Sequence, residues 1–212
     1  MKTKLSKAFV LLLVVLVQLA AFVPAHAAGQ SGETALAPLP SLNDFVASVK
    51  DGSANTVRGV YVPGKFALPV IQQPEGKGGY VSRDDGVVTQ YGYAARKGTV
   101  GLLAHNYLAG SKFTTLAAGQ IVQIVYGDGR IVNYEIAHVY RYQALQPNSA
   151  SSILVNLDDN KQYTAWDVFQ KVYTGGDHVT FQTCIEANGE LSWGRLFVVA
   201  LPYVDEANPS NK

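Results

Sequence analysis

Alternation of apolar and polar positions runs through most of the chain after residue 55 and predicts a mainly β protein. Short runs rich in β-branched and aromatic residues recur between turn signals such as Gly127-Asp128-Gly129. The predicted strands are 57–62, 66–72, 87–91, 99–104, 120–126, 131–142, 179–185 and 196–201. About eight short strands are typical of a closed or nearly closed β-barrel, and they are not typical of a parallel α/β sheet.

Two stretches have helical periodicity instead. Ser41 and Asp44 have the spacing of a capping box, and apolar residues follow them at intervals of three and four. Thr164 and Asp167 have the same spacing ahead of a second amphipathic run, which ends at the glycine pair 175–176. The pattern therefore adds one or two short helices, one before the strands and one between the late strands.

The N-terminal residues are predicted to be separate from the barrel. Three lysines precede an apolar stretch over 8–23, and Ala25-His26-Ala27 follows with small residues at the two positions that a signal peptidase reads. The stretch is shorter than the roughly 20 residues that a spanning helix needs. We expect a signal peptide over 1–27, with an uncleaved anchor as the alternative. The remaining predicted parts are a linker with the short helix (28–55), the barrel domain (56–204) and a C-terminal tail (205–212).

Composition narrows the class of protein further. The chain has 212 residues, 48% of them hydrophobic, which is enough for one well-buried domain. Its net charge of +1, with both signs interspersed, gives no argument for nucleic acid or for an anionic membrane surface. The only cysteine is Cys184, so no internal disulfide is possible. In an exported protein a single thiol is either reactive or simply buried in the core, and the count alone leaves both open.

The last predicted hairpin holds the most informative pair of residues. A turn centred on Asn188-Gly189 pairs Cys184 with Trp193 and Arg195 with Gln182, which makes Cys184 and Arg195 diagonal neighbours on one face. A bulge in the loop would change this register. A guanidinium beside a thiol favours the thiolate and can donate hydrogen bonds to an oxyanion on an attacked carbonyl.

Such chemistry also needs a group that protonates the leaving amine, and histidine suits that role because its pKa lies near neutrality. His105 ends an apolar run and opens a loop over 106–112, so it is the best candidate. His138 lies within a predicted strand and His178 at the start of another, where a histidine can be purely structural. None of the three has tight metal-ligand spacing with acidic residues.

At these positions the chain resembles the sortase family. The segment that ends at the cysteine reads Thr180-Phe181-Gln182-Thr183-Cys184 and resembles the sortase motif Thr-Leu-x-Thr-Cys, with Phe181 replacing the leucine. The segment led by Arg195 is similar to the last strand of sortases, and Ala104-His105-Asn106 is similar to their histidine loop, although Ala104 stands where sortases often have glycine. The likeness covers roughly 57–202 and keeps the order His, Cys, Arg.

The resemblance implies a sortase-like barrel and an exported cysteine transpeptidase of the bacterial cell surface. Cys184 would be the nucleophile, Arg195 the oxyanion stabiliser and His105 the proton-transfer group. The implied partners are a peptide sorting motif on a protein substrate and an amine acceptor, either a cell-wall precursor or a pilin lysine. Membrane contact is implied only if the N-terminal segment stays uncleaved. No cofactor is implied, and calcium dependence is left open because no acidic cluster maps to the calcium site of some family members.

Two alternatives remain at this stage. One is a cysteine peptidase of the same fold that only hydrolyses its substrate, since surface loops set the choice of acceptor. The other is a non-catalytic exported β-barrel that binds cell-wall polymer or peptide. The sequence does not define the recognised peptide, the acceptor, the sortase subclass or the oligomeric state.

Overall fold

Antiparallel strands dominate the part of the chain that the computed structural model describes, residues 38–203. The predicted signal peptide (1–27) and C-terminal tail (205–212) lie outside the described residues, as does the linker up to residue 37. Within residues 38–203, no helix combines the length and apolar character needed to cross a membrane.

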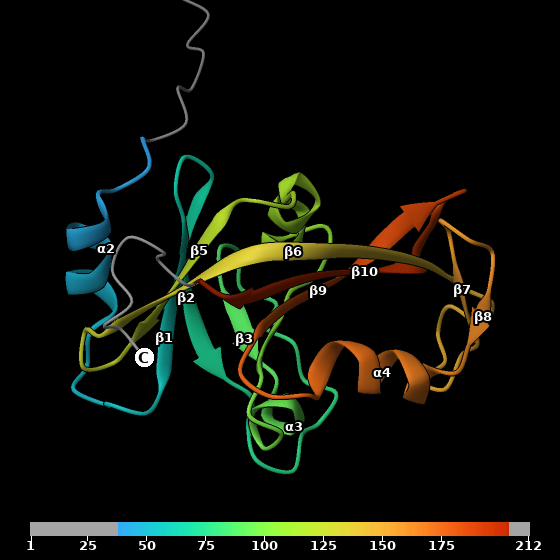
Figure 1. Ribbon diagram of the computed structural model, residues 1–212, viewed down its shortest axis with the longest axis horizontal. Coiled ribbons are helices and arrows are strands. Elements are labelled where there is room, and N and C mark those ends of the chain that lie inside the picture. The colour runs from blue at the N-terminus through green and yellow to red at the C-terminus, as the bar shows by residue number, and fades with distance from the viewer. Residues whose placement is uncertain (1–37, 204–212) are drawn as a thin grey trace, which may run out of the picture. The chain divides into compact units, whose positions relative to one another are not determined.

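Eight strands close into a barrel (Figure 1). In sheet order they are β10 (Glu190–Pro202), β9 (Val179–Ala187), β4 (Val100–Leu103), β3 (Val88–Gln90), β2 (Phe66–Gln72), β1 (Val57–Val62), β5 (Ile121–Tyr126) and β6 (Ile131–Ala144). Antiparallel pairing of β10 with β6 closes the ring, so none of these strands is left as an open edge. The prediction of a mainly β, closed barrel of about eight strands is confirmed.

The barrel interior is filled by alternate residues of these strands, as the period of two requires. On β9 the side chain of Phe181 points inward and is buried, and on β10 those of Leu196 and Val198 do the same. Their neighbours Gln182 and Phe197 therefore point outward. The outer face of β9 and β10 is consequently where side chains can reach a ligand.

Two strands and four helical segments lie outside the barrel wall. The strands are β7 (Leu154–Asn156) and β8 (Gln162–Tyr163), and the helical segments are α2 (Leu42–Val49), α3 (Gly92–Ala95), the 3-10 helix η1 (Ala109–Thr115) and α4 (Ala165–Tyr173). Both predicted helices are confirmed as α2 and α4. The sequence analysis missed β7, β8, α3 and η1. Runs this short carry too few residues for a periodicity to be recognised, and η1 falls partly in the predicted loop 106–112.

Helix α4 begins with a complete capping box. The hydroxyl of Thr164 accepts a hydrogen bond from the backbone N–H of Asp167 (3.1 Å), and the Asp167 carboxylate accepts one from the backbone N–H of Thr164 (2.9 Å). The apolar side of the helix, including Val168 and Val172, packs in one cluster with Phe197 of β10. The helix therefore covers part of the outer face of the β9–β10 hairpin and builds one wall of a groove there.

Candidate active site

The β9–β10 hairpin pairs Cys184 directly with Arg195, so the predicted pairings of Cys184 with Trp193 and of Arg195 with Gln182 are wrong. The turn is where it was expected, since Glu190 pairs with Ala187. Beyond it a bulge sets residues 191–193 against residue 186 and shifts the register by two. A shift of two keeps the alternation of faces, so Cys184 and Arg195 still share the outer face. Directly opposite residues have Cβ atoms about 4.5–5.5 Å apart.

His105 follows the end of β4, which lies parallel to β9 on the side opposite β10. Leu103 is in register with Gln182, and the backbone N–H of Ala104 donates to the carbonyl of Gln182 (3.3 Å). His105 is the next residue after Ala104, and Cys184 lies two residues after Gln182 on the neighbouring strand. The ends of β4, β9 and β10 thus gather the three residues that the sequence analysis selected, although these come from distant parts of the chain.

The backbone after His105 turns back tightly onto β9. The carbonyl of His105 accepts hydrogen bonds from the backbone N–H groups of Leu108 and Gly110, both at 3.0 Å. A Cβ at position 110 would lie 2.6 Å from the carbonyl oxygen of His105 and 2.7 Å from that of Ala104, and it would also overlap the hydroxyl of Thr183. Only glycine fits this contact, so Gly110 fixes the histidine loop against the strand that carries Cys184.

The imidazole of His105 is half-buried and stacks on Tyr107, with ring centroids 5.2 Å apart. Burial lowers the pKa of His105 below the ordinary value of 6.5, and the positive charge of Arg83 lowers it further, while a hydrogen bond with the backbone of Val81 acts in the opposite direction. The net shift favours the neutral imidazole, which can accept a proton.

The guanidinium of Arg195 is held by backbone carbonyls. Its Nη1 donates to Ser192 (2.8 Å) and Gly194 (2.9 Å), and its Nη2 donates to Pro147 (2.8 Å) in the loop between β6 and β7. These bonds use three of the five N–H donors of a guanidinium, and the Nε–H and one Nη2–H remain. The guanidinium of Arg195, the strand partner of Cys184, is therefore held in a fixed orientation and still has donors for a further acceptor.

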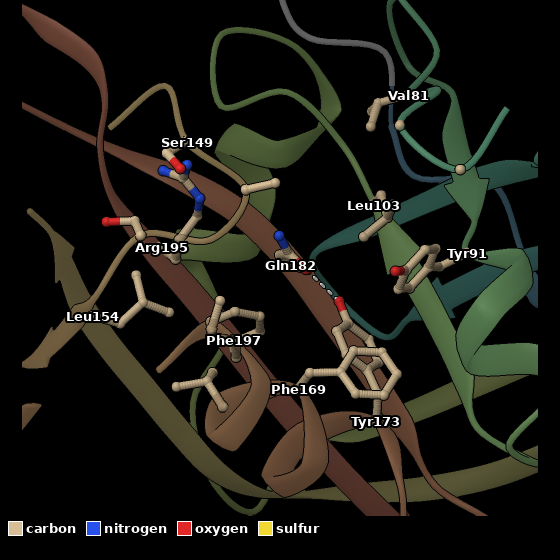
Figure 2. Close-up of a pocket in the computed structure, with 16 residues that line it drawn as sticks. Val81, Tyr91, Leu103, Ser149, Leu154, Phe169, Tyr173, Gln182, Arg195 and Phe197 are labelled. Carbon is tan, nitrogen blue, oxygen red and sulfur yellow. Dashed lines mark hydrogen bonds between the residues drawn. The ribbon is translucent and has the colours of Figure 1, made fainter. Parts of the chain in front are cut away.

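A groove of about 340 Å³ on the outer face is lined by Arg195 and by Gln182, which precedes Cys184 by two residues (Figure 2). Its lining residues include Tyr91, Leu103, Ser149, Leu154, Val168, Phe169, Tyr173, Gln182, Arg195 and Phe197. The walls are mostly apolar, and Gln182 lies between Arg195 on one side and Leu103 and Tyr91 on the other (Figure 2). An apolar groove with a few placed polar groups is typical of a ligand site.

The sequence analysis did not select Gln182 or Tyr173. The hydroxyl of Tyr173 donates a hydrogen bond of 2.5 Å to Oε1 of Gln182. The signal for Gln182 was present, because a residue two positions before Cys184 shares its face of the strand. No sequence signal placed Tyr173 there, because its contact depends on how α4 packs on the barrel.

A second hollow lies at His105 and is bordered by Tyr80, Val81, Arg83 and Asp84. Gly79 and Val81 line both this hollow and the groove, so the chain at 79–81 separates the two. The two hollows are therefore neighbouring spaces, one lined by Arg195 and Gln182 and the other by His105.

Among residues 38–203 the other two histidines, His138 and His178, are far from Cys184 in the strand pairing. His178 is buried, and its ring nitrogens are 2.9 Å from the backbone carbonyls of Gly176 and Val172. His138 stacks on Tyr140 along β6. Across residues 38–203, no group of three or more His, Cys, Asp or Glu side chains is arranged to hold a metal ion.

Comparison with known proteins yields matches among solved structures only. No protein-family model and no curated protein matches the chain. The solved structures include sortase C-1 from Actinomyces oris (14% identity, 79% of this chain and 83% of that chain, TM-score 0.46). Sortase A from Listeria monocytogenes (12% identity, 71% and 89%, TM-score 0.42) and a Clostridium perfringens sortase D5 transpeptidase (12%, 78% and 90%, TM-score 0.43) also match. Each likeness concerns the fold alone.

Proposed function

We propose that the chain is an exported cysteine transpeptidase of the sortase type, with Cys184 as nucleophile, His105 as proton-transfer group and Arg195 as oxyanion stabiliser. The observation that supports this best is the direct pairing of Cys184 with Arg195, a residue that lines the groove, next to the strand that leads into His105. A nucleophile, a proton acceptor and a fixed cation are the groups that acyl transfer needs.

In the first half-reaction the sulfur of Cys184 attacks a peptide carbonyl carbon while His105 takes the thiol proton. The carbonyl π electrons move to the oxygen, and the oxyanion accepts hydrogen bonds from the free donors of Arg195. His105 then returns its proton to the amine nitrogen as the C–N bond breaks. The products are a free amine and a thioacyl enzyme on Cys184.

In the second half-reaction an acceptor amine enters and attacks the thioester carbonyl. His105 takes a proton from the attacking nitrogen, the C–S bond breaks, and Cys184 leaves as thiolate before it is reprotonated. A new amide is formed, so no energy source is needed. Water in place of the amine gives hydrolysis by the same steps.

The two hollows suit the two halves of the substrate. The apolar groove beside Gln182 and Arg195 would hold the acyl part, and the hollow at His105 would hold the leaving and entering amines, because His105 must reach their nitrogen. The substrate would be a peptide sorting motif on a protein, and the acceptor a cell-wall precursor or pilin amine. Residues 1–27 would direct export, and residues 56–204 would form the catalytic domain.

The test is intact-mass analysis of the mature protein and its Cys184→Ala variant with an amine and Leu-x-x-Thr-Gly peptides in which the second and third residues are varied. The expected result is a thioacyl adduct, followed by an amide product, in the wild type only. Turnover retained by Cys184→Ala would overturn the mechanism. A thioacyl adduct that releases acid but no amide would support the hydrolytic alternative. A Cys184 that stays inert even to small thiol-reactive probes would favour the non-catalytic binding protein.

A further inference from the structure

The hydrogen bond between Tyr173 and Gln182 fixes which end of the glutamine amide faces the groove. Tyr173 is 2% exposed, and its ring packs against Tyr91, Phe169 and Phe197. Burial raises the pKa of Tyr173 well above its ordinary value of 10.0, and the neighbouring Tyr91 adds to this, so the hydroxyl keeps its proton and acts as a donor. Oε1 of Gln182 is thereby held as the acceptor.

The Nε2 group of Gln182 lies on the side of the amide away from Tyr173 (Figure 2). The groove that Gln182 lines has apolar side chains among its walls, including Leu103 and Phe197. Phe197 is the direct cross-strand partner of Gln182, so the amide and this ring share one patch of the wall. A neutral donor of fixed orientation in an apolar wall favours a ligand group that carries an acceptor, because an apolar group would leave the N–H donors without a partner.

The distance along β9 relates this donor to the reacting carbonyl. Gln182 precedes Cys184 by two residues on the same face, and a strand advances about 3.3 Å per residue, which gives about 7 Å. An extended peptide advances by the same amount. If its attacked carbonyl lies at Cys184 and its acyl part lies in the groove, the residue two positions before the attacked one lies at Gln182.

We propose that Gln182 is a specificity-determining residue, which selects a substrate whose side chain two positions before the attacked residue carries a neutral oxygen acceptor, and that Tyr173 positions it. The inference rests on the proposed function for the direction of the peptide, and it concerns the recognised motif alone. Asparagine and leucine are nearly the same size, so a peptide pair that differs only at this position isolates the hydrogen bond.

The experiment measures equilibrium binding of acetylated peptides Leu-x-Ala-Thr-Gly, with x as asparagine or leucine, to the mature Cys184→Ala protein by calorimetry. The asparagine peptide is expected to bind about tenfold tighter, as one hydrogen bond that leaves no unpaired donor would give. Equal affinity, tighter binding of the leucine peptide or no binding of either peptide would overturn the proposal.

Three further variants in the same background separate the donor from the shape of the groove. Gln182→Glu keeps an acceptor for the Tyr173 hydroxyl and removes both N–H donors, so the asparagine preference should vanish. Gln182→Leu should reverse it. Tyr173→Phe frees the amide to rotate and should weaken the preference while the leucine peptide binds as before. An unchanged preference for the asparagine peptide in Gln182→Glu would contradict the proposed role of Gln182. Thermal unfolding verifies that each variant is folded.

The same peptides given to the enzyme with an intact Cys184 report on the proposed function separately. Selective binding of the asparagine peptide without any thioacyl adduct would support the role of Gln182 and would contradict the proposed transpeptidase activity. Turnover of both peptides at equal kcat/KM would support the proposed transpeptidase activity and would contradict the role of Gln182 in specificity.

Discussion

Arg195 donates a hydrogen bond of 2.8 Å to the backbone carbonyl of Pro147, a residue 48 positions earlier in the chain. The bond ties the strand β10 to the loop between β6 and β7. Because the other two bonds of the guanidinium are local, to Ser192 and Gly194, Pro147 is the contact that connects its orientation to a distant element. The conformation of this loop should therefore influence the orientation of the Arg195 guanidinium, and with it the rate of the proposed reaction.

Ser152 offers a way to test that connection without touching Arg195. Its hydroxyl accepts a hydrogen bond from the backbone N–H of Gln146 (2.9 Å), next to Pro147, and it is 2% exposed. Ser152→Ala leaves the N–H of Gln146 without this partner, so we expect a loss of about 1–3 kcal/mol in unfolding free energy. We also expect a several-fold lower kcat, measured by peptide turnover.

The matched control is Ser151→Ala, which removes an exposed hydroxyl from the same loop. It should leave both stability and kcat nearly unchanged. Full activity of Ser152→Ala alongside a clear loss of stability would show that the loop does not set the orientation of Arg195.

Replacing Arg195 by lysine tests the role of the planar guanidinium. A lysine keeps the positive charge but cannot bond three carbonyls and still present donors in a fixed plane. Loss of one oxyanion donor typically costs about 10²–10³ in kcat, and Arg195→Lys should fall in that range. The measurement is kcat for thioacyl formation, with Arg141→Lys, an exposed position on β6, as control. A loss below about threefold would contradict the proposed role.

The barrel could be predicted because its strands alternate and its turns carry glycine. The predicted runs 57–62 and 66–72 match β1 and β2 residue for residue. The pairing of Cys184 with Arg195 could not be predicted, because the bulge over 191–193 has no distinctive sequence pattern. Cys184, His105 and Arg195 could be selected from the sequence by their chemical types and by the resemblance. The groove could not be predicted, because Tyr173 and Phe197 meet only after α4 packs on the hairpin.

Gly110 should be irreplaceable for positioning His105. A methyl group there would meet backbone carbonyls of His105 and Ala104, which cannot move aside as a side chain would. Gly110→Ala should lower the unfolding free energy by about 1–3 kcal/mol, as overpacking does, and should displace His105 so that turnover is lost. Urea unfolding and peptide turnover measure the two effects.

Gly92→Ala serves as the comparison for this variant. A Cβ at Gly92 would make only ordinary contacts, the nearest at 3.5 Å to the side chain of Gln73. It should retain stability and activity. Normal turnover in a folded Gly110→Ala protein would show that the close approach does not hold the histidine in place.

The lowered pKa of His105 predicts a specific pH dependence. Proton binding to the imidazole is disfavoured by burial first and by Arg83 second. NMR titration should give His105 a pKa below 6.5, and the acid limb of kcat/KM should lie at the same pH if this group transfers the proton. Arg83→Gln removes the repulsion and should move both midpoints upward together. Arg96→Gln, which removes a guanidinium over the ring of Tyr93, should move neither.

The lowered pKa of His105 also makes the stability of the folded protein depend on pH in a defined direction. In the unfolded chain His105 has an ordinary pKa. Near and below pH 6.5 its imidazole is therefore protonated in the unfolded chain, while in the folded protein it is still neutral. The contribution of His105 to stability is therefore fully present above that pH and is lost as the pH falls from 6.5 toward the folded pKa. Urea unfolding between neutral and mildly acidic pH should show this loss, and it should be smaller in Arg83→Gln. An acid limb that stays in place when the NMR midpoint moves would exclude His105 as the proton-transfer group.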